Sequence, residues 1–266
     1  MPRIKRTPAE QEFAADAGAE FLEALARGLR VIEAFGRDRR WLTLSDVARL
    51  VGLPRASVRR ILATLVKLGY AEVDDRLFRL TPRILTLAGA YLASNAISDI
   101  VQPALERFSG EIGEACSAAV LDGAEVVMVA HASPSRMLPV SAQIGLRLPA
   151  LSTSLGRVLL AALGDRQVDA LIARTKVPKL TAVTVTDKAD LRRAIMKARA
   201  DDFCLADQEA EPGFRSISVP LKRRDGRTIA ALNVGVHTER VPLDAMREVF
   251  LPRLRALAGT LAPQLI

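Results

Sequence analysis

The stretch from Gly52 to Tyr70 constrains the possible folds of this chain more than any other segment. It reads GLPRASVRRILATLVKLGY, in which a proline and three arginines precede an apolar run that ends at a glycine. Pro54 suits the first turn of a helix, because its φ is fixed and its missing N–H would have no intrahelical partner there. Gly69 suits the left-handed residue that often follows a helix. The stretch therefore predicts a helix that runs from about Pro54 to Leu68.

A second, shorter helix is predicted directly before it. Thr43-Leu44-Ser45-Asp46 matches a capping box, in which the threonine oxygen accepts from a backbone N–H three residues on and the Asp46 side chain reaches back. An apolar face follows and ends at Gly52. Two helices joined by so short a turn form a helix-turn-helix. An amphipathic helix over about residues 20–35 precedes the pair, and two short strand-like pieces, YAEVDD and RLFRLTP, follow it as a wing would.

The predicted second helix has one apolar face and one basic face. On a wheel of about 100° per residue, the basic arc holds Ala56, Arg59, Arg60, Ala63, Thr64 and Lys67, with Arg55 and Ser57 at its borders. Small residues between arginines let a helix approach the floor of a groove, and arginine can bond guanine O6 and N7 in bidentate fashion. From Phe21 to Arg83 the sequence holds 13 Lys/Arg against 7 Asp/Glu, which is +6 of the net +8 of the chain.

Contact with DNA is the favoured interpretation of this unit. A basic face can also be merely solvated, but this one lacks the glutamates at i,i+4 that usually balance such arginines. A phosphate-handling active site would need a Gly-rich loop or a metal-holding carboxylate nearby, and neither is present. The candidate DNA-binding residues are Thr43, Arg55, Ala56, Ser57, Arg59, Arg60, Thr64, Lys67 and, in the wing, Arg76.

The rest of the chain predicts helices at about residues 82–92 and 97–112 and then an α+β domain. Its sheet of five or six mostly antiparallel strands is drawn from ACSAAVLDG, AEVVMVAHASP, PVSAQIGLRLP, RSISVPLKR and RTIAALNVGVH, the last two joined at Arg224-Asp225-Gly226. Helices are expected at about residues 154–162, 165–173, 187–201 and 243–261.

Enzymatic chemistry is not predicted. Cys116 and Cys204 form no CxxC motif, and His131 and His237 each stand alone on strand-like stretches, so neither a metal site nor a catalytic constellation is expected. Ser152 to Gly156 does not form a GxSxG elbow. No apolar run has membrane-spanning length. We therefore expect a reduced, cytoplasmic protein without cofactor or metal and without contact to a membrane.

Several motifs together resemble the IclR-type bacterial transcriptional regulators. LTLSDVARLVGLPRASVRRILATLVKLGY and FRLTPRILTLAGAYLAS resemble the DNA-binding half, whereas IGLRLPALSTSLGRVLLAAL and RTIAALNVGV resemble the effector-binding half. The sequence PRASVRRIL…LTPRIL most resembles members of the branch that governs catabolism of protocatechuate, 4-hydroxybenzoate and related aromatic acids. The resemblance implies a winged helix-turn-helix domain, a helical linker that makes homodimers or dimers of dimers, and a GAF/PAS-like domain that binds a small metabolite.

With that resemblance the predicted organisation is a disordered tail over 1–19, a DNA-binding domain over 20–82, a helical linker over 83–112 and an effector-binding domain over 113–266. The expected partners are a palindromic DNA operator and a small organic acid, since a two-fold pair of helices doubles the readout of one. A ligand-independent architectural DNA-binding protein and a hydrolase with an appended helix-turn-helix are the alternatives.

By position, the resemblance implies effector contacts from Ser154, Leu155, Asp207, Glu209, Ser216, Ser218, Asn233 and Gly235. Ser154 and Leu155 would lie at a helix N-terminus, where free N–H groups favour a carboxylate. Ser154 could instead be a plain helix cap, and the two acidic residues could cap turns or pair with Arg215. Met128 is a candidate apolar wall for an aromatic ring, although a methionine in a strand more often belongs to the core.

Overall fold

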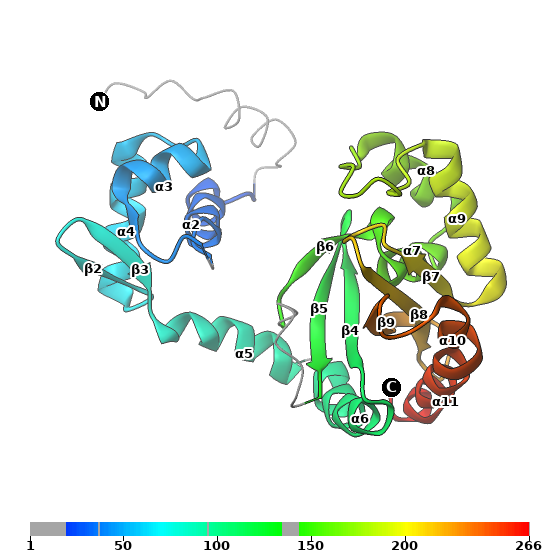
Figure 1. Cartoon of the computed structure of the whole chain (residues 1–266). Helices are drawn as coiled ribbons and strands as arrows, with labels where there is room; N and C mark the ends of the chain where they lie inside the picture. Colours follow the sequence, from blue (N-terminus) through cyan, green and yellow to red (C-terminus); the bar gives the residue numbers. More distant parts are fainter. Residues whose placement is uncertain (1–19, 37, 95, 135–143, 266) are drawn as a thin grey trace. The chain divides into compact units, whose positions relative to one another are not determined.

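The computed structural model describes residues 20–36, 38–94, 96–134 and 144–265. The chain divides into two compact units, Met1–Tyr91 and Leu92–Ile266, each shown in Figure 1. The division falls inside helix α5 (Leu85–Ser94), within the segment predicted as a linker. The predicted tail over 1–19 lies outside the described residues, as do the first five residues of the predicted strand PVSAQIGLRLP.

Up to residue 81, the described part of the N-terminal unit contains three helices and a small antiparallel sheet, and a 3-10 turn over Pro82–Ile84 leads into α5. The helices are α2 (Glu23–Glu33), α3 (Leu44–Val51) and α4 (Arg55–Leu68). The strands β1 (Leu42–Thr43), β2 (Ala71–Asp74) and β3 (Leu77–Leu80) form a sheet in the order β1-β3-β2. The core that holds these elements together consists of Val31, Leu42, Val47, Val51, Leu53, Val58, Leu62, Leu65 and Ala71 with smaller neighbours.

The ends of the two helices of the predicted helix-turn-helix are confirmed. Thr43 Oγ1 accepts from the Asp46 N–H at 3.2 Å, and the Thr43 N–H donates to Asp46 Oδ2 at 3.2 Å, which completes the capping box. Gly52 and Gly69 have φ values of 66° and 79°, a left-handed conformation that favours glycine. Strand β1 was not predicted, because two residues carry no periodic signal.

Within the described residues, the C-terminal unit is built on a six-stranded antiparallel sheet in the order β6-β5-β4-β9-β8-β7. The strands are β4 (Ala115–Asp122), β5 (Glu125–Ala132), β6 (Arg147–Pro149), β7 (Cys204–Asp207), β8 (Phe214–Lys222) and β9 (Thr228–His237). Within this sheet, strand β7 is the one that the alternation of apolar residues did not predict. The α+β fold class is confirmed.

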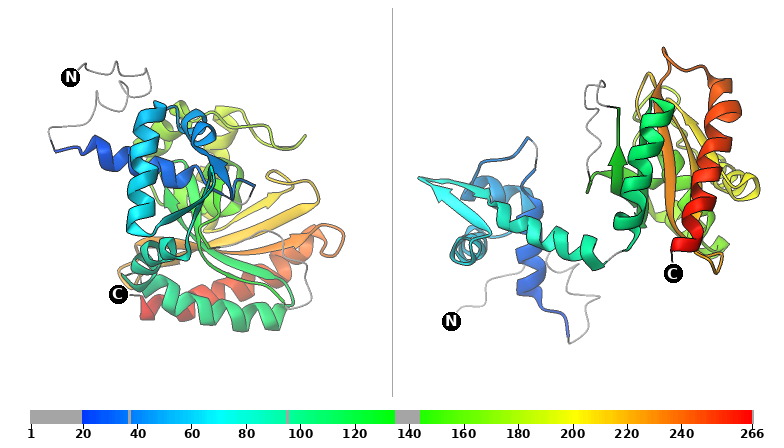
Figure 2. Two further views of the ribbon diagram at one scale, coloured as in Figure 1. Left: turned by 90° about the vertical axis from the view of Figure 1, so that its left-hand side faces the viewer. Right: turned by 90° about the horizontal axis from the view of Figure 1, so that it is seen from below.

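Helices cover both faces of this sheet. On one face, α6 (Ala96–Ile112) and α11 (Leu251–Leu261) lie side by side, and Val101, Leu105, Phe108 and Leu254 are buried against β-strand residues (Figure 2). On the other face, α7 (Ser154–Ala161) packs on β8 and β9, with α8 (Asp165–Arg174) and α9 (Lys188–Asp201) outside it. The segment predicted as a linker thus ends in a helix that is part of the C-terminal core.

The C-terminal helix is not regular over its whole length. It begins as α10 (Leu243–Ala245), passes through a π-helical turn over Met246–Phe250 and continues as α11. The Leu251 N–H donates to Met246 O, five residues back. Pro252 follows directly and has no N–H to give to the preceding turn, which explains why the regular pattern changes here. Among the described residues, no helix has both the length and the apolar composition of a membrane span.

Candidate functional site

Helix α4 exposes the basic face that the sequence predicts. Val58, Leu62 and Leu65 are buried, whereas the opposite side is exposed and comprises Arg55, Ala56, Arg59, Arg60, Ala63, Thr64 and Lys67. Ser57 is half-buried at the border. The apolar half of the helix anchors it to the core of the N-terminal unit, and that packing decides which residues face outward.

The cations of this face have no acidic partners among the described residues. Arg55, Arg59, Arg60 and Lys67 take part in no ion pair there, and neither does Arg76 in the turn between β2 and β3. Nearby arginines differ: Arg49 pairs with Asp46, and Arg79 pairs with Glu72 and lies 4.6 Å from the centre of the Trp41 ring. Unpaired, exposed guanidinium groups on one helix face are available for phosphates and base edges.

Two hydroxyls proposed for DNA contact are already engaged within the protein. Thr43 Oγ1 donates to Asp46 Oδ2 at 2.6 Å as well as accepting from the Asp46 N–H, so its main role is the helix cap. Thr64 Oγ1 donates to Arg60 O at 2.9 Å within α4. Each oxygen can still accept a further hydrogen bond.

A row of polar side chains crosses the face of the large sheet that is covered by α7. Cross-strand pairing joins His131 to Ser117, Ser117 to Asn233, and Asn233 to Ser218. Directly paired residues project to the same face of a sheet. Ser117 is 4%, Asn233 8% and Ser218 0% exposed, so these three residues form a buried polar surface, and His131 at the end of the row is half-buried.

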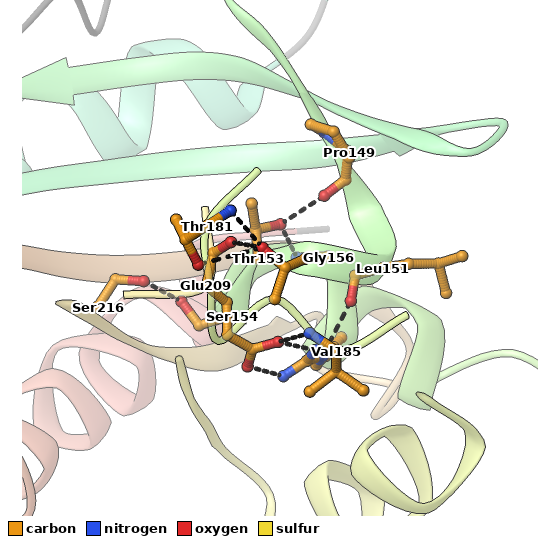
Figure 3. A network of polar contacts seen from close by, with 11 residues as sticks. Pro149, Leu151, Thr153, Ser154, Gly156, Thr181, Val185, Glu209 and Ser216 are labelled. Atoms are coloured by element: carbon orange, nitrogen blue, oxygen red, sulfur yellow. Dashed lines mark hydrogen bonds and ion pairs between the residues drawn. The ribbon is translucent and has the colours of Figure 1, made fainter. Parts of the chain in front are cut away.

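Helix α7 adds a hydroxyl to this row. Ser154 Oγ lies 2.7 Å from Ser216 Oγ and 2.8 Å from Ser218 Oγ, and Figure 3 shows Ser154 and Ser216 directed toward each other. The helix cap is Thr153, whose Oγ1 accepts from the Gly156 N–H at 3.1 Å. The backbone N–H groups of Ser154 and Leu155 have no hydrogen-bond partner among the described residues, which leaves two donors at a helix N-terminus.

Two glycines allow the close packing around this row. A Cβ on Gly156 would lie 2.0 Å from the backbone oxygen of Ala150, and a Cβ on Gly235 would lie 2.5 Å from Cζ of Phe214. Gly235 pairs with Ser216 across β8 and β9. Gly235, which the sequence suggested as an effector contact, therefore makes room for the Phe214 ring beside the polar row.

Arg157 and Glu209 form a buried ion pair. Figure 3 shows Glu209 in the same network of polar contacts as Ser154 and Ser216. Arg157 Nη1 and Nη2 donate to the two Glu209 oxygens at 2.5 and 2.6 Å, and the Val185 N–H donates to Glu209 Oε2 at 3.2 Å. Burial by itself lowers the pKa of Arg157, but the hydrogen bonds and the charge of Glu209 outweigh it and the pKa is raised. Both carboxylate oxygens of Glu209 are thus engaged within the protein.

Of the other candidate residues, Asp207 lies on the opposite face of the sheet, whereas Met128 and Leu155 lie under α7. Asp207 pairs across β7 and β8 with Arg215, 3.0 Å away, and both alternate with Ser216 onto the opposite face of the sheet. Met128 and Leu155 are 3% and 4% exposed and belong to the apolar cluster under α7. The structure therefore brings Ser154, Ser216, Ser218, Asn233 and Gly235 together and does not bring Asp207 to them.

Ser117, His131 and Arg157 are members of this site that the sequence did not suggest. Ser117 is the only hydroxyl in the apolar strand β4, which was an available signal.

Burial lowers the pKa of His131. Burial also raises the pKa of Cys116 to about 12 and that of Cys204 to about 11, so neither thiol is a nucleophile at neutral pH. No group of metal-ligating side chains occurs among the residues with described positions.

Comparison with known proteins assigns both halves of the chain. The model of the IclR helix-turn-helix domain matches residues 24–75, and the model described as Bacterial transcriptional regulator IclR C-terminal matches residues 89–262. The Pca regulon regulatory protein of Pseudomonas putida is 40% identical over 99% of this chain and 91% of its own length. The p-hydroxybenzoate hydroxylase transcriptional activator of Acinetobacter baylyi is 37% identical over 91% of each chain.

A solved structure agrees with these matches. The IclR homolog from Microbacterium hydrocarbonoxydans complexed with 4-hydroxybenzoate is 29% identical, with a TM-score of 0.77 over 90% of this chain and 98% of that chain. The relatives are transcriptional regulators and not enzymes, and the match to the IclR helix-turn-helix domain implies that the N-terminal unit binds DNA. The chain belongs to the IclR family of bacterial transcriptional regulators.

Proposed function

We propose that this regulator senses a small aromatic acid of the hydroxybenzoate class on the α7-covered face of its large sheet. The observation that carries the proposal is the buried polar row of Ser117, Asn233 and Ser218. It lies beside the backbone N–H groups of Ser154 and Leu155, for which the described residues provide no acceptor. Buried polar groups are rarely left without partners, and a row of them next to free donors suits a small polar ligand.

The chemistry of a hydroxybenzoate matches this surface. Its carboxylate would take the free N–H groups at the start of α7, where the helix dipole favours negative charge. Its ring would lie against apolar residues such as Met128, and its hydroxyl would reach polar groups of the row, among which Asn233 has no side-chain hydrogen bond to any described residue. Two relatives are named Pca regulon regulatory protein and p-hydroxybenzoate hydroxylase transcriptional activator. The second name and the solved complex of an IclR homolog with 4-hydroxybenzoate support this ligand class.

For DNA, we propose that Arg59 and Arg60 contact base edges and that Arg55 and Ser57 contact phosphate. Lys67, Thr64, Ala56, Thr43 and the wing residue Arg76 would complete the surface. One recognition helix reads few base pairs, so a homodimer or a dimer of dimers on a palindromic operator is the expected assembly. The expected organisation is a DNA-binding domain over 20–82, a helical linker over 83–112 whose second helix, α6, also packs in the core of the C-terminal unit, and an effector domain over 113–266. The protein would act in the cytoplasm, where the DNA is.

A thermal-shift series on the full chain tests the effector. 4-Hydroxybenzoate and protocatechuate should raise the melting temperature, since a ligand at 100 times its dissociation constant stabilises by about 2.7 kcal/mol. 4-Hydroxybenzyl alcohol is the matched control, because it keeps the ring and hydroxyl and lacks the carboxylate. The absence of a shift with every aromatic acid tried would refute the proposed ligand class, and an equal shift with the alcohol would refute the role of the carboxylate.

A further inference from the structure

Gln102 of α6 holds the outer edge of strand β5 at His131. Strand β6 pairs with β5 only from Glu125 to Val127, so the edge at His131 has no strand neighbour among the described residues. The His131 N–H donates to Gln102 Oε1 at 3.0 Å, and Gln102 Nε2 donates to His131 O at 2.9 Å. The glutamine amide thus satisfies both backbone groups of one strand residue, as a neighbouring strand would.

The side chain of the same histidine belongs to the polar row. His131 Nδ1 lies 3.0 Å from Ser117 Oγ, and Ser117 is paired across the sheet with Asn233. Burial lowers the pKa of His131, which keeps the imidazole neutral and leaves one ring nitrogen as an acceptor. The backbone of His131 is therefore hydrogen-bonded to α6 through Gln102, and its ring contacts the proposed effector surface through Ser117.

Helix α6 is the first helix that lies wholly in the C-terminal unit, and it follows α5, the helix in which the two units divide. Its apolar side, with Val101 and Leu105, is fixed in the core of the unit. Apolar contacts of this kind tolerate small sliding movements, whereas a two-point hydrogen bond fixes position and direction. Gln102 joins α6 to the backbone of His131, so a displacement of His131 caused by a ligand at the polar row would also displace this helix.

We propose that Gln102 is a positioning residue that couples occupancy of the polar row to the position of α6. The inference rests on the proposed function: an acid bound at the row competes for the Ser117 hydroxyl, the hydrogen bond of the His131 ring changes, and the backbone that Gln102 holds moves with it. The ligand then changes the operator affinity of the DNA-binding unit through α6. The two-point contact gives this coupling a physical connection that can be cut at one side chain.

The test is Gln102→Leu in the full chain, which keeps the size of the side chain and removes both hydrogen bonds. Operator affinity is measured with and without 4-hydroxybenzoate on a palindromic fragment selected in vitro against the parent protein, and binding of the acid is measured by calorimetry. In the parent we expect a ratio of at least about fivefold between the two operator affinities. In the variant the acid should bind within about threefold of the parent, while the ratio falls below about twofold.

Glu106→Ala is the matched control. Glu106 is exposed on the same helix and accepts from Gln102 Nε2 at 2.9 Å, so its removal changes the other partner of the glutamine without touching β5. We expect this control to keep the parent ratio. A parent-like ratio in Gln102→Leu would overturn the inference, because a role limited to stability leaves the coupling ratio unchanged.

A double-mutant cycle measured without ligand distinguishes failure of this inference from failure of the proposed function. If the parent binds no aromatic acid or binds it without effect on DNA, the proposed function fails, and the melting temperatures of Ser117→Ala, Gln102→Leu and the double variant decide the connection. Linked positions give a loss in the double variant that differs from the combined single losses, whereas independent positions add. Additive losses would overturn the inference.

Discussion

The guanidinium of Arg157 and the carboxylate of Glu209 are joined by two hydrogen bonds of 2.5 and 2.6 Å, at positions that are 3% and 8% exposed. The residues come from α7 and from the loop after β7, so the pair fixes the start of α7 relative to the sheet edge. Removing one partner of a buried pair leaves an uncompensated charge and costs about 3–5 kcal/mol. We expect Glu209→Leu to lower the free energy of unfolding by that amount, measured by urea denaturation.

The double variant Arg157→Met with Glu209→Leu is the companion measurement. An apolar pair of similar size leaves no buried charge, so the double variant should be more stable than either single variant. If the single and double variants lost equal stability, the ion pair would not be what holds α7 in place.

Arg59→Ala and Arg60→Ala should each cost about 1–3 kcal/mol in operator binding and relax the base preference, because these side chains lie on the exposed centre of α4. Arg55→Ala should weaken binding to all sequences and reduce the slope of affinity against salt by about one. Fluorescence anisotropy on operator and random DNA distinguishes the two classes. Arg253→Ala, exposed on α11 in the other unit, is the control, and equal losses on both DNAs for all three variants would contradict the assignment.

Ser154→Ala should weaken binding of 4-hydroxybenzoate about tenfold, or about 1.4 kcal/mol. The variant removes the hydroxyl that lies within hydrogen-bond distance of both Ser216 and Ser218, so the polar row loses its link to α7. Isothermal titration calorimetry measures the loss. Thr260→Ala, exposed on α11, should bind the acid like the parent. Parent-like affinity in Ser154→Ala would remove this serine from the effector site.

Gly156→Ala should destabilise the C-terminal unit by about 3 kcal/mol, the upper end of the usual cost of overpacking. The new methyl group would meet backbone atoms of Ala150, the nearest at 2.0 Å, and backbone cannot rotate away as a side chain can. Gly110→Ala in α6 is the matched helix substitution, since a Cβ there meets nothing within 4 Å. That control should gain up to about 1 kcal/mol from helix propensity. Equal melting temperatures for the two variants would show that α7 can move away from Ala150.

Glu114 should make the stability of the C-terminal unit depend on pH. Burial raises the pKa of Glu114, although the charges of Arg240 and His237 act in the other direction. The native state then keeps the proton to a higher pH than the unfolded chain does, so the contribution of Glu114 is fully present below the ordinary pKa of glutamate and is lost as pH rises through the raised value. Glu114 is 5% exposed, and its Oε2 has no hydrogen-bond partner among the described residues.

Glu114→Gln removes this titration and keeps a polar group beside Arg240, whose Nη2 lies 3.0 Å from Glu114 Oε1. Between about pH 4 and about pH 7 the variant should lose less stability than the parent, by urea unfolding at each pH. Glu111→Gln, at an exposed position of α6, should follow the parent. A variant whose stability changes with pH as the parent's does would show that Glu114 ionises alike in the native and unfolded states.

Much of the local structure could be predicted from the sequence because local signals determine it. Pro54 and Gly69 mark the ends of α4, and the capping box of Thr43 and Asp46 marks the start of α3. The apolar period of α4 also determines which of its faces is basic. Short or interrupted elements carry weaker signals, which is why β1, β7 and the π-helical turn before Pro252 were not predicted.

The candidate effector site was decided by tertiary structure. Ser117, Asn233 and Ser218 come from three separate strands, and only the register of those strands places them in one row. The same alternation turns Asp207 to the opposite face, beside Arg215. The sequence by itself determined the elements and the basic face of α4, because periodicity and caps act within a few residues. Tertiary structure alone decided three features: the polar row, the Arg157–Glu209 pair and the hydrogen bonds between Gln102 and His131. Each joins residues far apart in the chain, and such contacts depend on packing and register that no local pattern encodes.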